Sequence, residues 1–474
     1  MSASDDALDE LRALGRPFEE AEAALVRAIV SSPAFLSDAD EAVIRYALNL
    51  ARTTRLRVPD GGDVDLTEVL APYRDELLPA AATLAAPGGF SPDEAGRLVH
   101  QLGAHARAWR DRVLAAFPGR LQPSALDREV CEKAVVLVCG GGGGVGWSYL
   151  GAFALLEQYG LVPRLLAGTS MGAVLLLFRA RRLRWHSADV AEAMRGLSFR
   201  TLFRFLHGES RYGLPAAMRL YLRAAIGDFL KGPDGHPLTL GQLAIPLVVA
   251  VTGIRNGALP RDPSYYEHLL DLGGEEPRPN VLSRIVTDVF QAIGELLVQR
   301  DRFARIYLGA DEETREFDAI DAVGFSSALP GVIHYDVVRD DERMHALLRA
   351  LLERHDLFRL VDGGLVDNLP ARAAWGAVQR GATGVRNAFV IALEGFGPKI
   401  SQPLWYGLEQ LAAQNVARNR PFIHLYRSFQ RVLSPLEVVP DDAALQRAIQ
   451  AGKAELHPDM PYVARMCRPF PPIT

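Results

Sequence analysis

The stretch VVLVCGGGGGVGWSYLG, from Val135 to Gly151, joins an apolar run to five consecutive glycines and a further glycine at Gly146. The apolar run predicts a buried strand, and the residues beyond the glycines predict a helix. Backbone amides in a glycine-rich turn of this kind can bind a phosphate, a dinucleotide or the oxyanion that forms during acyl transfer. Each of these ligands implies a different class of enzyme, and the rest of the chain decides between them.

The composition is that of a folded globular protein. The chain has 474 residues, of which 49% are hydrophobic and 23% charged, and this balance argues against disorder over most of its length. The net charge of -5 gives no reason to expect a nucleic-acid partner. The three cysteines are too few for a disulfide framework, the N-terminal segment is acidic where a signal peptide is basic, and the apolar runs are too short to span a membrane. We expect a cytoplasmic protein that at most lies on a membrane surface.

Residues 1–130 are expected to form an all-α N-terminal domain. Leucines recur there at helical spacing, and capping motifs at Ser37 and at Ser91, which precedes Pro92, mark the starts of two helices. The region contains no recognisable catalytic pattern, so no role is assigned to it.

Residues 131–400 have the pattern of an α/β domain. Short apolar runs alternate with helical patterns, which predicts a mostly parallel central sheet flanked by helices, with functional loops at the carboxyl ends of the strands. The segments 199–241 and 256–315 lose this pattern and are expected to be insertions over the sheet edge. Residues 401–474 are expected to form a helical C-terminal extension that packs on this domain.

Two of the three interpretations of the glycine run lack residues that their chemistry needs. A phosphate-binding loop requires Lys and then Ser or Thr after its last glycine, whereas Trp and Ser follow Gly146. A dinucleotide-binding loop fits better, because Gly141, Gly143 and Gly146 satisfy the G-x-G-x-x-G spacing. The second strand should then end in an acidic residue that binds the ribose, but residues 162–170 contain none. A dinucleotide-binding oxidoreductase is kept only as an alternative.

The second strand ends instead in a G-x-S-x-G sequence, from Gly168 to Gly172, directly before an apolar helix. In this setting the pattern predicts a nucleophile elbow, in which small flanking residues let the chain turn sharply and place Ser170 at the helix N-terminus. An ordinary tight turn is the alternative. A serine that attacks an ester forms an oxyanion, and the glycine run on the neighbouring strand could bind it, because no side chain separates its amides from the ligand.

The serine also needs a proton acceptor. The strongest candidate is Asp362 in the sequence LVDGGLVDNLP, from Leu360 to Pro370, where an apolar strand ends in an aspartate and two glycines. An Asp-Gly-Gly turn without catalytic function is the alternative. A histidine triad of the α/β-hydrolase type would have to use His424 or His457, the histidines that follow Asp362, and neither lies in a recognisable motif. We expect a structural or surface role for both histidines.

Four motifs occur in order along the chain: the glycine run with the helix behind it, GTSMG, SSALPG from Ser326 to Gly331, and DGGLVDNLP. Together they resemble the patatin-like phospholipase family over approximately residues 134–400. The resemblance implies a three-layer sandwich with the sheet in the middle. The SSALPG stretch resembles a segment that lies close to the active site in this family, and no chemical role is assigned to it.

The resemblance implies a serine acyl-ester hydrolase with a Ser-Asp dyad and no histidine. Ser170 would be the nucleophile and Asp362 the general base, and amides of Gly141, Gly142 and Gly143 would form the oxyanion hole. The expected reaction is cleavage of the fatty-acyl esters of a phospholipid or another acyl lipid, as in a phospholipase A or a lysophospholipase. No cofactor and no metal are implied, and the chain has no cluster of His, Asp and Glu at metal-ligand spacing.

Two features bear on the substrate. Val145 occupies the position where the family usually has Arg or Lys, so a preference for phospholipids stays open while ester cleavage does not depend on it. The basic segments Phe178–Trp185 and Phe199–Gly213 could bind an anionic membrane surface in a peripheral association. A solvated arginine face on a helix is the simpler interpretation of both segments.

Overall fold

The computed structural model of the chain describes residues 3–58, 61–86, 91–194, 197–205, 210–257, 302–395, 415–429, 433–435 and 437–473. The chain forms two compact units. The first comprises Met1–Val136, Trp375–Phe389 and His457–Thr474, and the second comprises Leu137–Ala374 and Val390–Leu456. The domain boundaries expected near residues 130 and 400 stay a prediction. Most of the insertion expected at 256–315 lies outside the described residues.

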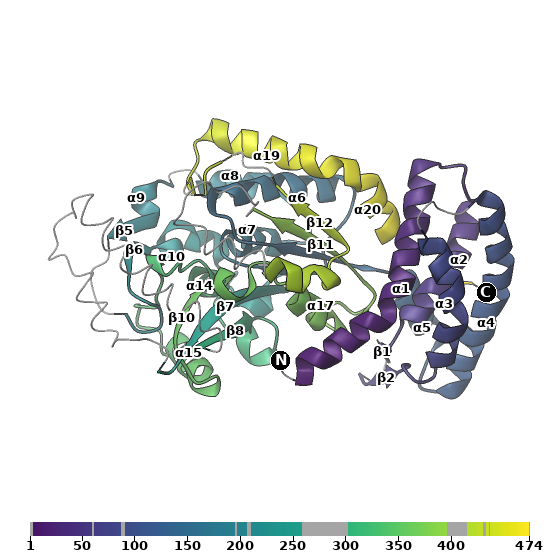
Figure 1. Cartoon of the computed structure of the whole chain (residues 1–474). Helices are drawn as coiled ribbons and strands as arrows, with labels where there is room; N and C mark the ends of the chain where they lie inside the picture. The colour runs from purple at the N-terminus through teal and green to yellow at the C-terminus, as the bar shows by residue number, and fades with distance from the viewer. Residues whose placement is uncertain are drawn as a thin grey trace. The chain divides into compact units, whose positions relative to one another are not determined.

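The first unit is mainly helical, as the sequence predicts (Figure 1). Its helices are α1 (Ala3–Ser31), α2 (Asp38–Arg52), α3 (Ala71–Ala85), α4 (Pro92–Ala116), α5 (Pro123–Cys131) and α20 (Met460–Cys467). Both expected caps are confirmed. The Ser37 hydroxyl accepts the Asp40 N–H at 3.1 Å, and Ser91 and Glu94 form a reciprocal capping box with Pro92 in the first turn. These bonds satisfy amides that have no partner inside the helix, and they define where α2 and α4 begin.

A short antiparallel strand pair also occurs in this region, which the helical spacing did not indicate. In strands β1 (Arg55–Arg57) and β2 (Asp63–Asp65), Leu56 lies opposite Val64, and both side chains are buried. Each strand has 3 residues, which is too few for an alternating pattern to be recognised in the sequence.

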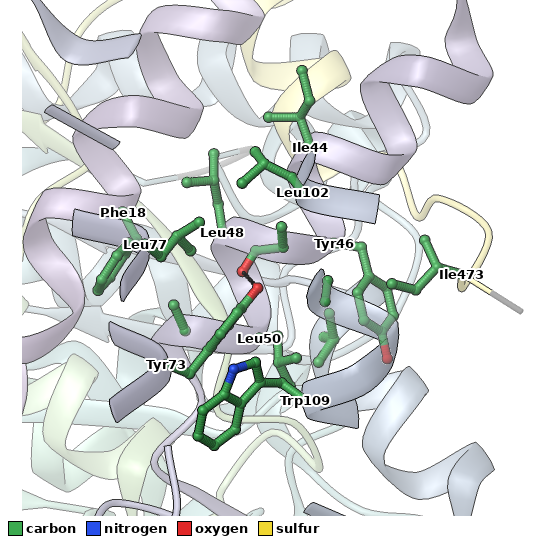
Figure 2. Close-up of a cluster of buried hydrophobic side chains, with 14 of the residues drawn as sticks. Phe18, Ile44, Tyr46, Leu48, Leu50, Tyr73, Leu77, Leu102, Trp109 and Ile473 are labelled. Carbon is green, nitrogen blue, oxygen red and sulfur yellow. Dashed lines mark hydrogen bonds between the residues drawn. The ribbon is translucent and has the colours of Figure 1, made fainter. Parts of the chain in front are cut away.

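The hydrophobic core of the first unit lies among these helices (Figure 2). Phe18 of α1, Leu48 of α2, Tyr73 of α3 and Trp109 of α4 are all buried. The Tyr73 hydroxyl donates a hydrogen bond to the backbone oxygen of Ala47 at 3.1 Å, so the polar atom of this ring is satisfied within the core. Four helices therefore share one core, which explains why they form one unit.

The second unit is built on a seven-stranded mixed sheet. Its strands are β3 (Ala134–Cys139), β4 (Leu165–Gly168), β7 (Leu247–Arg255), β8 (Phe303–Leu308), β10 (Leu357–Asp362), β11 (Ala388–Glu394) and β12 (Leu425–Ser428). The strand order is β10-β7-β4-β3-β11-β12, and β8 also pairs with β7. β4 is parallel to β7 and β11 to β12, whereas β8 and β10 are antiparallel to β7. β3, β4 and β11 are buried along their whole length, which is why their sequences are continuous apolar runs.

Helices flank this sheet, so the predicted α/β class with a mostly parallel central sheet is confirmed. They include α6 (Tyr149–Gln158), α7 (Met171–Ala180), α8 (Ser187–Met194), α13 (Glu312–Arg315), α14 (Ala319–Ser326), α15 (Glu342–Arg354), α16 (Gly364–Asp367), α17 (Ala371–Gln379) and α19 (Asp442–Leu456). In Figure 1, α19 (yellow) runs alongside α6, and the two helices are in contact.

The segment 199–241 contributes two strands to a separate three-stranded sheet. β5 (Phe203–Phe205) pairs antiparallel with β6 (Ala216–Leu220), and β6 pairs parallel with β9 (Gly331–His334). The short helices α9 (Phe199–Leu202) and α10 (Leu222–Ile226) adjoin these strands in the sequence. Apolar side chains of all these elements form part of a pocket wall.

Candidate active site

Ser170 follows β4 and precedes α7, in a backbone conformation that residues other than glycine rarely adopt. Its φ is 53° and its ψ is -128°, and such strain is typical of functional sites. The turn is tightly packed, because a Cβ at Gly172 would lie 2.4 Å from the backbone oxygen of Cys139. Ser170 is the N-cap residue of α7, where the helix dipole favours a developing negative charge.

A buried hydroxyl holds this strained turn in place. Ser326, the last residue of α14, accepts the Ser170 N–H at 2.8 Å and donates to the backbone oxygen of Ala250 on β7 at 2.7 Å. Ser326 is fully buried, so water does not compete for either bond. Ser326 belongs to the SSALPG stretch, and its role was missed by the sequence analysis. The available signal was a pair of serines at the end of an apolar helix.

Strand β7 brings the ends of β4 and β10 together. β4 is parallel to β7 and ends with Gly168 opposite Val249, while β10 is antiparallel to β7 and ends with Asp362 opposite Val251. β8 covers the other edge of β7 over the same residues, so β4 and β10 share one edge and approach each other end to end. Their last residues are separated by two positions on β7, which is roughly 7 Å of strand. Ser170 and Asp362 therefore come from strands of opposite direction.

Asp362 is a buried carboxylate with uncharged partners. Its Oδ1 accepts the Gly364 N–H at 2.7 Å, and the residue lines the same pocket as Ser170. Burial raises the pKa of Asp362 to about 6, while the hydrogen bonds from Ser170 and Gly364 act in the opposite direction. A carboxylate with this pKa is ionised at neutral pH and is a stronger base than an exposed aspartate.

The glycine run follows β3 and continues into the 3-10 helix η1 (Gly143–Ser148). At Gly143 φ is 55°, and a Cβ would lie 2.0 Å from the backbone oxygen of Pro435, so only glycine fits this position. Gly142 and Gly143 line the same pocket as Ser170 and Asp362. The structure therefore brings two of the three glycines expected to bind the oxyanion next to the serine and the aspartate.

The third glycine has a different environment. The Gly141 N–H donates to Oδ1 of Asn368 at 3.2 Å, and Gly141 is not among the described residues that line the pocket. Asn368 does line the pocket and is 2% exposed. This asparagine lies within DGGLVDNLP, but nothing local in the sequence indicates that it contacts the glycine run.

The pocket encloses a cavity of about 210 Å³. Its wall includes Met171, Val174 and Phe178 of α7 and Phe203, Met218 and Ile333 of the small sheet. Asp362 is the one charged side chain among the described residues of the lining. An apolar wall with a few polar groups at one place suits a hydrocarbon chain whose reactive group lies at those polar residues.

No histidine is among the described residues that line the pocket. His424 lies just before β12, and its Nδ1 accepts the backbone N–H of Val390 at 2.9 Å. His457 begins a short 3-10 helix (His457–Asp459) and belongs to the first unit.

The described residues also contain no group of three or more His, Cys, Asp or Glu side chains that could hold a metal ion. None of the described helices is both long enough and apolar enough to cross a membrane.

Comparison with known proteins identifies the family of the chain. A family model described as patatin-like phospholipase matches residues 137–375, just over half of the chain, and this segment contains the glycine run, Ser170 and Asp362. None of the curated proteins compared with the chain matches it. Members of the matched family are lipid acyl hydrolases. The chain belongs to the patatin-like phospholipase family.

Proposed function

We propose that the protein is a serine acyl-ester hydrolase in which Ser170 and Asp362 form a catalytic dyad. The observation that carries this proposal is a buried carboxylate, Asp362, that lines the same apolar pocket as Ser170 and whose pKa the Ser170 side chain lowers. A serine hydroxyl becomes a nucleophile when a base within hydrogen-bond reach takes its proton. Asp362 meets this requirement without a histidine.

The reaction would proceed in two steps. Ser170 Oγ attacks the carbonyl carbon of a fatty-acyl ester while its proton moves to Asp362, and the alcohol or lysolipid leaves with that proton. Asp362 then takes a proton from water, the resulting hydroxide attacks the acyl-serine, and the fatty acid leaves as Ser170 recovers the proton. The raised pKa of Asp362 suits both transfers, because a base is most effective when its pKa lies close to the working pH.

The oxyanion formed in each step needs hydrogen-bond donors close to Ser170. We assign this role to the amides of Gly142 and Gly143, because both residues line the pocket with Ser170. The bond from the Gly141 N–H to Asn368 supports a different role for Gly141, which is to hold the loop in place.

An acyl lipid suits the pocket better than a small polar ester. A hydrocarbon chain gains free energy by leaving water for an apolar wall of this kind. Val145 is 1% exposed, and a charged Arg or Lys at such a position would be costly to bury. We therefore propose phospholipase A or lysophospholipase chemistry in which the acyl chain, and not a cation in the glycine loop, determines binding.

The first basic segment offers little free charge to a membrane. Within Phe178–Trp185, Arg181 pairs with Asp189 at 3.5 Å and Arg184 pairs with Glu157 at 2.5 Å. These pairs support the interpretation of this segment as a solvated and internally compensated arginine face.

The second basic segment is the better candidate for peripheral membrane contact. Phe199 of α9 lines the pocket and is 50% exposed, and the neighbouring Arg200 is exposed as well. An exposed aromatic ring beside a cation suits the interface of an anionic lipid layer. Residues 206–209 of this segment lie outside the described residues.

Hydrolysis of a medium-chain p-nitrophenyl ester tests the proposal. We expect Ser170→Ala and Asp362→Asn each to lower kcat by at least about 10⁴-fold, and a His424→Ala/His457→Ala double variant to retain it. A comparable loss in the histidine variant would favour a triad over the dyad. A wild-type protein no faster than Ser170→Ala would reject the hydrolase assignment for this class of ester.

A further inference from the structure

Asn368 carries a polar group that the dyad mechanism does not use. The side chain is 2% exposed and lines the pocket with Ser170. Its Oδ1 accepts the Gly141 N–H at 3.2 Å, and this bond identifies which end of the carboxamide is the oxygen. Its Nδ2 is buried and has no hydrogen-bond partner within the described part of the chain.

An unpaired buried donor of this kind has a cost. Leaving a polar group buried without a partner destabilises a protein by about 1–3 kcal/mol, and few such groups persist in folded proteins. The carboxamide of Asn368 cannot remove this cost by rotating, because Nδ2 would then face the Gly141 N–H and two donors would meet. Nδ2 therefore has an unsatisfied hydrogen bond that a bound molecule could accept.

Two close approaches place this carboxamide between the aspartate and the glycine run. A Cβ at Gly364 would lie 2.9 Å from Asp362 Oδ1 and 3.3 Å from Asn368 Oδ1, so both side chains flank this backbone position. A Cβ at Gly140 would lie 3.4 Å from Asn368 Nδ2, so the nitrogen lies against the start of the glycine run. Nδ2 is thus close to the loop that supplies the amides assigned to the oxyanion.

We propose that Asn368 Nδ2 is a further donor of the oxyanion hole, which donates a hydrogen bond to the carbonyl oxygen of the ester as that oxygen becomes negative. This inference rests on the proposed hydrolase function. Asparagine side chains can act in oxyanion holes beside backbone amides, and the bond strengthens as negative charge develops on the acceptor. Because Nδ2 has no partner among the residues that the structure describes, none of the bonds described for it has to break when the substrate binds.

Two substitutions distinguish a donor from a residue that only braces the loop. Asn368→Ala removes both functions, whereas Asn368→Asp keeps an oxygen that can accept the Gly141 N–H and replaces the donor with a second, negatively charged oxygen. For an oxyanion donor we expect kcat for a medium-chain p-nitrophenyl ester to fall about 10²–10³-fold in Asn368→Ala, with KM changed by less than about threefold. Asn368→Asp should be slower still. If Asn368 only holds the loop in place, Asn368→Ala should be slower than Asn368→Asp. That result would overturn the proposal.

A second substrate separates this role from an effect on folding. In the matching thionoester the carbonyl oxygen is replaced by sulfur, which is a weak acceptor, so the loss in Asn368→Ala should be at least about tenfold smaller than with the ester. An equal loss on both substrates would overturn the proposal. A wild-type protein that turns over neither substrate faster than Ser170→Ala would reject the hydrolase function itself, and the role of Asn368 with it.

Asn419→Ala is the matched control. Asn419 is also buried, but both ends of its carboxamide are bonded: Oδ1 accepts the Arg372 N–H at 2.8 Å and Nδ2 donates to Asp367 at 2.7 Å. We expect Asn419→Ala to lower the thermal midpoint without changing the ratio of ester to thionoester turnover.

Discussion

Each unit of the protein buries a carboxylate, and the surroundings of the two carboxylates differ in charge. Glu22 of the first unit is fully buried and accepts hydrogen bonds from Lys133 at 2.6 Å and from Arg45 at 2.9 Å. Burial alone would raise its pKa, but Lys133, Arg45 and Arg52 lower it to about 2. Asp362 of the second unit is 6% exposed and has only uncharged partners among the described residues, so burial keeps its pKa raised, at about 6.

Because the pKa values of these two buried carboxylates shift in opposite directions, burial by itself does not identify a catalytic base. A buried carboxylate among cations stays ionised and contributes to structure. A buried carboxylate without cations has a raised pKa, so it can accept a proton close to neutral pH. Asp367, which follows Asp362 in the same motif, is also buried but has a cation among its partners. It accepts hydrogen bonds from Tyr307 at 2.6 Å and from Asn419 at 2.7 Å, and it pairs with Arg418 at 3.4 Å.

The largest loss of stability is expected when Glu22, the carboxylate surrounded by cations, is removed. Glu22→Ala would leave the buried Lys133 without its counter-charge, and Arg45 and Arg52 would keep only their pairs with Glu41 and Glu19. We expect the free energy of unfolding to fall by about 3–5 kcal/mol. Urea unfolding followed by circular dichroism measures this loss. The control is Glu20→Ala on the same helix, whose exposed pair with Arg16 should contribute less than about 0.5 kcal/mol.

The pH dependence of the same stabilisation follows from the pKa of Glu22. The folded value of about 2 lies below the ordinary value of 4.5, so the contribution is present above pH 4.5 and is lost as the pH falls towards 2. If Glu22→Ala and the wild type differ equally at about pH 7 and about pH 2.5, the ionised carboxylate is not the source of the stability.

Asp362→Asn should raise the stability of the protein, in contrast to the loss expected for Glu22→Ala. The folded pKa of about 6 lies above the ordinary 3.8, so stability is lost as the pH rises from 3.8 through 6. This shift corresponds to about 3 kcal/mol. We therefore expect the inactive Asp362→Asn variant to be more stable than the wild type by about that amount near pH 8, and by much less near pH 4.

Thermal and urea unfolding at both pH values measure this gain. Asp367→Asn is the contrasting variant, because it weakens bonds to Tyr307 and Arg418 and should lower stability at either pH. If the wild type is as stable as Asp362→Asn near pH 8, burial of the ionised Asp362 carboxylate does not destabilise the protein.

Ser326→Ala tests how far catalysis depends on the strained turn. The substitution removes the acceptor of the Ser170 N–H, so Ser170, the proposed nucleophile, loses the bond that holds its backbone. We expect kcat to fall about 10–100-fold with KM nearly unchanged, because small displacements of a nucleophile are costly. Ser187→Ala, which changes an exposed serine, should have no effect. Unchanged kcat in Ser326→Ala would mean that the packing of α7 suffices to hold Ser170.

The smallest expected effect is the pH dependence of the wild-type reaction. In the proposed mechanism Asp362 must be ionised to take the proton of Ser170, and burial raises its pKa to about 6. We expect kcat/KM to rise about tenfold per pH unit below 6 and to level off above it. The Glu22→Ala variant should retain this profile, since its carboxylate takes no part in the reaction. A profile that is flat down to pH 4.5 would contradict the assigned base.

The fold class could be predicted because the patterns that indicate strands and helices lie within short segments of the sequence. The buried strands β3 and β4 are short apolar runs with a glycine at the carboxyl end, and the caps of α2 and α4 are complete within four residues. The strand pair β1 and β2 was missed because it is too short to show a pattern. For the candidate site, Ser170, Asp362 and the glycine run could be predicted because each lies in a local motif, and their roles stay a prediction. Ser326 and Asn368 were not singled out, because their contacts are distant in the chain.

By itself, the sequence determined the α/β class, the family and the motifs from which the site is assembled, because strand, turn and helix patterns depend on neighbouring residues. Only the tertiary structure decided that β10 runs antiparallel to β7 and meets β4 end to end. It also decided that Asn368 bonds Gly141 and that Ser326 bonds Ser170, across 227 and 156 positions of the chain. Strand direction and register depend on how distant segments pack, and a local pattern does not record them.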